Sequence, residues 1–64
     1  MQRGQVVEVM QAFEGKRLMV VVEWTNRLVY VCRRSEFSRA TSEHRNPKST
    51  GFPREFVREL DHEG

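Results

Sequence analysis

The chain has 64 residues, of which 38% are hydrophobic and 31% charged, and its formal net charge is +2. A chain of this length forms one small domain, residues 1–64, and it is too apolar for a disordered protein. Its longest apolar runs, residues 18–22 and 28–32, have five residues each, whereas a membrane-spanning helix needs about 20. We therefore expect one domain outside the membrane. A single cysteine and no apolar secretory signal predict a cytoplasmic protein.

The charge is distributed unevenly along the chain. Residues 1–26 are neutral, residues 27–54 hold seven cations and two acids, and residues 55–64 hold one cation and four acids. The middle segment therefore carries +5 and the tail −3. Arginine dominates, with nine Arg to two Lys, and its planar guanidinium suits phosphate and carboxylate recognition. The charge pattern alone does not distinguish such a site from a solvated basic loop.

Three strands are predicted in the first half of the chain. Residues 5–13 are rich in strand formers and follow Gly4, and residues 14–16 have turn chemistry with Gly15. Residues 18–24 and 28–32 are two runs of β-branched and aromatic residues around Thr25-Asn26-Arg27. These two runs predict a hairpin.

The hairpin has two apolar faces in its simplest register. A two-residue loop at Thr25-Asn26 places Val22 opposite Val29 and Val20 opposite Val31. The other face then carries Met19, Val21, Leu28, Tyr30 and Cys32. A sheet with one wet side needs only one apolar face, so we expect either a sheet curled on itself or a partner surface.

The segment 33–51 is polar and basic, with Phe37 as its only bulky apolar residue. We expect a long loop there, or a short edge strand around residues 36–41. The tail, residues 51–60, permits two interpretations. Pro53 fits the first turn of a helix, or a short turn leads into a closing strand at Phe56-Val57.

This tail resembles the end of an SH3-like small barrel. The matching residues, in the family's order, are Gly51, Phe52, Pro53, Phe56, Val57 and Leu60. The resemblance implies a mainly β barrel of four or five antiparallel strands with a short 3-10 or α-helical turn near the C-terminus. It also implies that Pro53 and Phe56 occupy positions of the family's ligand groove.

The resemblance covers about ten residues and does not assign a ligand. Peptide-binding members also carry an early Ala-Leu-Tyr-Asp-Tyr strand, an acidic loop and a paired tryptophan, none of which this chain has. Small archaeal chromatin proteins, KOW domains and Tudor domains are similar in outline. The closest features are the strand opened by Gly4 and a short helix near Pro53.

Catalytic and metal-binding patterns are absent from the sequence. Cys32, His44 and His62 do not have the spacing of a zinc site, and Cys32 ends an apolar run where a free cysteine packs as a small hydrophobe. Residues 48–51 lack the glycines of a phosphate loop. We therefore expect no enzyme, no metal and no cofactor.

Two functions remain as hypotheses. The first is nucleic-acid binding by the basic segment and adjoining aromatics, with these site residues: Arg27, Arg33, Arg34, Arg39, Arg45, Lys48, Tyr30 and Trp24. The second is a protein-interaction module or small regulatory subunit, which binds another protein or self-associates as a homo-oligomer. Its interface residues are Met19, Val21, Leu28 and Tyr30. The sequence does not distinguish DNA, RNA and protein ligands.

Overall fold

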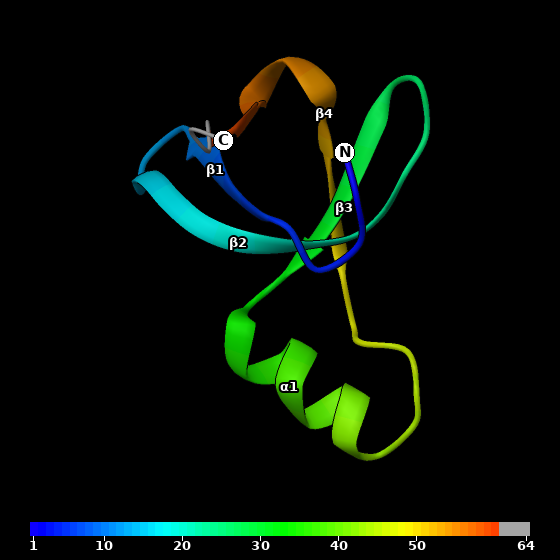
Figure 1. Cartoon of the computed structure of the whole chain (residues 1–64). Coiled ribbons are helices and arrows are strands. Elements are labelled where there is room, and N and C mark those ends of the chain that lie inside the picture. The colour runs from blue at the N-terminus through cyan, green and yellow to red at the C-terminus, as the bar shows by residue number, and fades with distance from the viewer. Residues whose placement is uncertain (61–64) are drawn as a thin grey trace.

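The computed structural model describes residues 1–60, which form a five-stranded antiparallel sheet of order β4-β3-β2-β1-β5 (Figure 1). The strands are β1 (Val6–Gln11), β2 (Gly15–Trp24), β3 (Leu28–Cys32), β4 (Thr50–Pro53) and β5 (Val57–Glu59). An α-helix, α1 (Arg34–Ser42), connects β3 to β4, and a 3-10 turn, η1 (Arg54–Phe56), connects β4 to β5.

The sheet curls because its longest strand belongs to two ladders. The first half of β2, from Gly15 to Val20, pairs with β1, and its second half, from Val20 to Trp24, pairs with β3. A twisted strand shared in this way turns the sheet into a half-barrel (Figure 1). The expected fold class, a small mainly β barrel with a short turn before the last strand, is confirmed.

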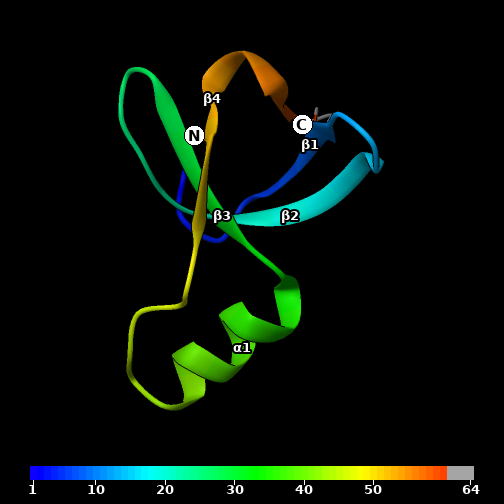
Figure 2. The same ribbon diagram turned by 180° about the vertical axis from the view of Figure 1, so that it is seen from behind.

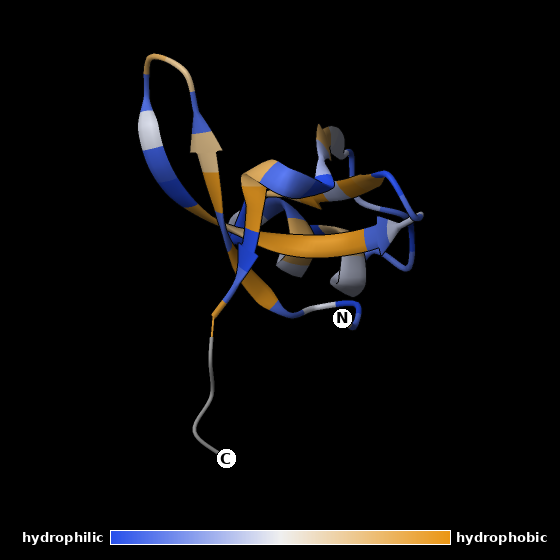
Figure 3. Cartoon of the chain, turned by 90° about the horizontal axis from the view of Figure 1, so that it is seen from above, coloured by the Kyte–Doolittle hydropathy of each residue, from blue (hydrophilic) through white to orange (hydrophobic). Residues whose placement is uncertain are grey.

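Valines fill the inside of the half-barrel. Its centre consists of side chains that are at most 1% exposed: Val7, Val9, Val21, Val29 and Val31. They alternate along their strands with outward-pointing residues, and Met1, Met19, Phe52 and Val57 pack around them. Figure 3 shows the same concentration of apolar residues along the strands. Burying each valine contributes roughly 1.5–3 kcal/mol.

The prediction of a loop or edge strand in the segment 33–51 is wrong for residues 34–42, which are helical. The helix contains three serines and a threonine, which are weak helix formers. Its N-cap residue, Arg33, makes no side-chain capping hydrogen bond. Packing stabilises the helix instead. Ala40 is fully buried, and α1 contacts β2. The guanidinium of Arg3 lies over the Phe37 ring, with its Cζ atom 5.6 Å from the ring centroid.

The predicted hairpin register is also wrong. Val21 lies opposite Val31 and Val20 opposite Cys32, and the register shifts between Val21 and Glu23. The backbone N–H groups of Arg27, in the turn, and Leu28, at the start of β3, both donate to the Thr25 hydroxyl. The side chain that closes the turn and the bulge together shift the pairing by one residue at Val31 and Cys32 and by two residues at Val29 and Tyr30. Each β3 residue therefore lies opposite a different β2 residue from the one predicted.

Buried residues lie on both sides of the hairpin. The inward side lies in the valine core; Val20, Val22 and Cys32 are also buried, and α1 contacts β2. Burial raises the pKa of the Cys32 thiol. In the part of the chain that the structure describes, no helix is long and apolar enough to cross a membrane.

Candidate nucleic-acid interface

The inside of the half-barrel becomes polar at one end. On β1, Val7 and Val9 are followed at the same spacing by Gln11, and Arg17 of β2 lies directly opposite Val9. On β3, Val29 and Val31 are followed by Arg33, whose backbone is still extended before α1 begins. Because side chains alternate along a strand, these polar residues continue the rows of core valines.

These rows end in a hollow of about 440 Å³, which we call the basic hollow. Its cations are Arg17, Arg33 and Lys48, which come from β2, the end of β3 and the segment before β4. Its other lining residues are Gln11, Met19, Val31, Cys32, Glu36, Thr50 and Phe52. Three cations thus line the hollow together with one acid.

That acid, Glu36, is paired with the side chain of Arg45, which does not line the hollow, and with the backbone of Lys48, which does. Its Oε2 accepts a hydrogen bond from Nη1 of Arg45 at 2.8 Å and another from the backbone N–H of Lys48 at 3.1 Å. The bond from Arg45 is the main reason why the pKa of Glu36 is lowered. Nε of Arg45 also donates to Glu43 at 2.7 Å. Glu36 therefore fixes the chain after α1 and holds Lys48 at the hollow.

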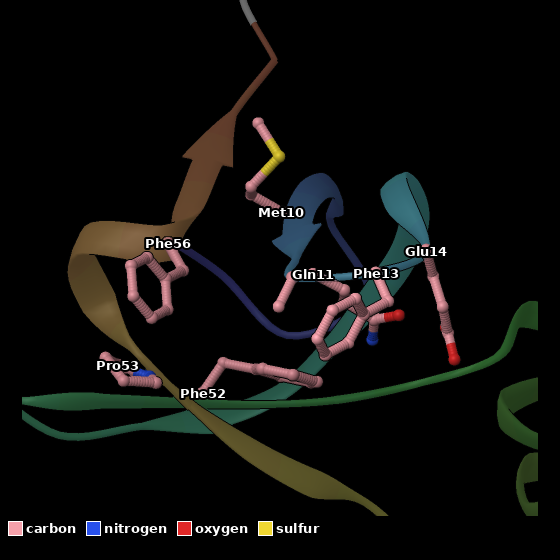
Figure 4. Close-up of a pocket in the computed structure, with 8 residues that line it drawn as sticks. Met10, Gln11, Phe13, Glu14, Phe52, Pro53 and Phe56 are labelled. Atoms are coloured by element: carbon pink, nitrogen blue, oxygen red, sulfur yellow. The ribbon is translucent and has the colours of Figure 1, made fainter.

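A second depression, the aromatic groove, lies beside the basic hollow and has a volume of about 380 Å³. Its lining residues are Met10, Gln11, Ala12, Phe13, Glu14, Phe52, Pro53 and Phe56. Figure 4 shows the three phenylalanine rings around this space. Phe13, in the β1–β2 turn, is 100% exposed, and Phe56, in η1, is 46% exposed. Pro53 and Phe56 are the two residues that the SH3-like resemblance placed at a groove.

The groove and the hollow form one continuous surface, because Gln11 and Phe52 line both. The surface connects the η1 end of the molecule with the α1 end, which lie opposite each other in Figure 2. The Oε1 atom of Gln11, at the junction, is buried and has no hydrogen-bond partner within residues 1–60. The junction is thus a place where an acceptor is left unsatisfied by the protein.

The structure brings only part of the predicted arginine cluster together. Arg33 and Lys48 line the basic hollow, whereas Arg45 is held in ion pairs with Glu36 and Glu43. Arg34 borders a different depression, formed with Val6, Leu18, Met19 and Val20. Arg39 is exposed in the last turn of α1.

The remaining predicted nucleic-acid contacts lie away from the hollow. Arg27 is in the β2–β3 turn, and Trp24, 40% exposed, precedes that turn. Tyr30 packs over Gly51 on the neighbouring strand. None of these three residues lines the basic hollow or the aromatic groove.

The predicted protein interface is not an exposed face. Val21 is fully buried in the core, and Met19 is half-buried against it. Leu28 and Tyr30 are half-buried and, in the observed register, project from the opposite side of the sheet. In the observed register these four residues therefore do not lie together on one face of the sheet.

Sequence reasoning missed Arg17, Gln11 and Phe13. For Gln11 a usable signal was the alternation of Val7, Val9 and Gln11, and for Arg17 it was the alternation of Val21, Met19 and Arg17. A polar residue that continues a row of core residues lies at the end of the barrel. The signal for Phe13 was an aromatic residue in a turn, next to Glu14-Gly15.

The described residues form no candidate metal site. Within residues 1–60, no three His, Cys, Asp or Glu side chains gather where they could hold a metal ion. His62, one of the three candidate ligands in the sequence, lies outside the described residues.

Comparisons with known proteins add no family assignment. No protein-family model matches the sequence, and neither the curated proteins nor the solved structures include a significant match.

Proposed function

We propose that this protein is a non-catalytic module that binds nucleic acid, with the basic hollow contacting the phosphates. The observation that carries the proposal is the convergence of Arg17, Arg33 and Lys48, which are far apart in the sequence, on one hollow. The single acid of the hollow, Glu36, is already paired with Arg45. The site therefore presents a surplus of positive charge to a ligand.

The cations of the hollow are available at low energetic cost. Within the described residues, Arg33 and Lys48 take part in no ion pair. Arg17 lies 3.5 Å from Glu14, but both side chains are about half exposed, and exposed pairs contribute only about 0–1 kcal/mol. A phosphate can therefore replace water around these groups without breaking a strong internal interaction.

Phosphate is an anion that fits this arrangement. Arginine's parallel N–H groups match two phosphate oxygens, and lysine adds a compact charge. A strand that neutralises its phosphates on the protein also releases bound counterions, which makes affinity depend steeply on salt. Enzymatic chemistry is not part of the proposal, because nothing in the surface calls for it.

The test is a pair of charge-matched variants. Fluorescence anisotropy with labelled 12-nucleotide strands and a labelled hairpin duplex, at about 50 mM salt, should give a weaker affinity for Arg33→Gln, by about fivefold. Arg27→Gln removes the same charge from the β2–β3 turn and should change the affinity far less. Equal losses in both variants would assign binding to net charge and contradict the site. Absence of binding to every nucleic acid at low salt would contradict the function.

A further inference from the structure

We infer that the nucleic acid is single-stranded and that its unpaired bases stack in the aromatic groove while its phosphates lie in the basic hollow. The inference rests on the proposed function and adds the class of ligand to it. The aromatic groove supports it independently, because none of the three cations of the hollow lines the groove.

The groove exposes rings that a folded domain normally shields. Phe13 is completely exposed in a tight turn, and Phe56 is nearly half exposed. Together with Phe52 they surround one open space (Figure 4). Each ring offers an apolar face or edge, and every nucleobase offers a complementary flat face, so stacking there does not require a particular base.

The arrangement of groove and hollow matches the repeat of a nucleic acid strand. Such a strand alternates a charged phosphate with a flat, weakly polar base. The surface has a cationic part and an aromatic part that adjoin at Gln11 and Phe52. The positive charge of the hollow favours an anionic ligand, and the phenylalanine rings beside it favour a ligand that carries planar bases.

A double helix uses only half of this surface. In a duplex the base faces are stacked on one another and are inaccessible to Phe13 and Phe56, whereas the phosphates remain accessible. A duplex can therefore contact Arg17, Arg33 and Lys48 but leaves the rings in water. A single strand contacts both parts, and we expect it to bind more tightly.

The experiment separates bases from phosphates. Wild-type protein is titrated by anisotropy with a 12-nucleotide DNA strand, an RNA strand of the same sequence, a hairpin duplex and an abasic strand with the same number of phosphates. We expect the DNA or RNA strand, or both, to bind at least about tenfold more tightly than the duplex and the abasic strand.

Phe13→Ala is the decisive variant, because a fully exposed side chain can be removed without disturbing the core. It should weaken single-strand binding about tenfold and leave abasic-strand binding unchanged. Phe56→Ala provides a second measurement. The matched control is Leu18→Ala, which removes a 65% exposed apolar side chain outside the groove and the hollow and should change neither affinity.

The two proposals fail in different ways. If duplex and single strand bind equally, or if Phe13→Ala binds the single strand like wild type while Arg33→Gln still weakens it, the single-strand inference is overturned and nucleic-acid binding stands. If no nucleic acid binds, both fall. If a proline-rich or acidic peptide binds more tightly than any strand, with the same loss in Phe13→Ala, the groove belongs to a protein partner and the inference is overturned.

Discussion

The ring of Tyr30 lies directly over Gly51 on the neighbouring strand. A methyl group at position 51 would come within 2.8 Å of the ring carbon Cε1 and 3.1 Å of Cδ1. The two residues face each other across the β3–β4 pair, where a glycine leaves the space that the aromatic ring fills. Gly51 therefore has a packing role, although it lies in a strand where glycine is normally unfavourable.

Gly51→Ala should destabilise the protein by about 1–3 kcal/mol, because either the ring or the strand must move. Urea unfolding followed by circular dichroism measures the loss. In a Tyr30→Ala background the same substitution should cost much less, since the ring is gone. An equal cost in both backgrounds would show that backbone effects and not the contact are responsible.

Val21→Ala should lower the free energy of unfolding by about 2 kcal/mol. The side chain is fully buried in the core, so its truncation loses apolar burial and leaves a cavity. Leu18→Ala, on the same strand but 65% exposed, should stay within about 0.5 kcal/mol of wild type. If the two variants cost the same, the inward orientation of Val21 is incorrect.

Glu36 should make stability depend on acid pH. The hydrogen bond from Arg45 lowers the pKa of Glu36 below its ordinary value of 4.5 in the folded protein. The folded state therefore holds the proton less tightly than the unfolded state. The stabilisation is fully present above about pH 5 and is lost as the pH falls through the lowered pKa.

Denaturation curves from pH 7 to pH 2 test this effect. The stability difference between wild type and Glu36→Gln should shrink toward acid pH. Arg45→Gln should remove the same pH-dependent part, because it removes the principal cause of the lowered pKa. Glu59, whose pKa is lowered mainly by a hydrogen bond from Gln5, contributes an acid loss that both variants retain. A difference that stays constant over the whole range would contradict the prediction.

Salt should weaken single-strand binding in proportion to the number of cations in the hollow. Three phosphate contacts predict a slope of about −2 in a plot of log affinity against log salt concentration. The double variant Arg17→Gln/Arg33→Gln should reduce the slope to about −0.7. A slope that is unchanged in the double variant would place the phosphates elsewhere on the surface.

The strands were predictable because their chemistry is local. Residues 6–9 include three valines, and the two runs of β-branched and aromatic residues on either side of Thr25 are typical of strands. The turn before the last strand was predictable from Gly51, Phe52 and Pro53, whose order resembles that of a known barrel ending.

The helix and the site depended on tertiary contacts that the sequence does not display. α1 has few strong helix formers and is stabilised by burial of Ala40, by packing on β2 and by the pairing of Glu36 with Arg45. The charge count placed Arg45 among the ligand contacts, although its partners were already in the same segment. The charge count also missed Arg17, because residues 1–26 are neutral overall, although the Arg17 side chain lines the basic hollow.

Within residues 1–60 the half-barrel has two edge strands, β4 and β5, and their composition limits what can add to them. β4 has four residues and ends in Pro53, which has no N–H to donate, and β5 has three residues, of which Arg58 and Glu59 are charged and exposed. Short edges with a proline or charges are poor templates for another strand. Pairing of these edges with strands of other copies of the chain is therefore disfavoured.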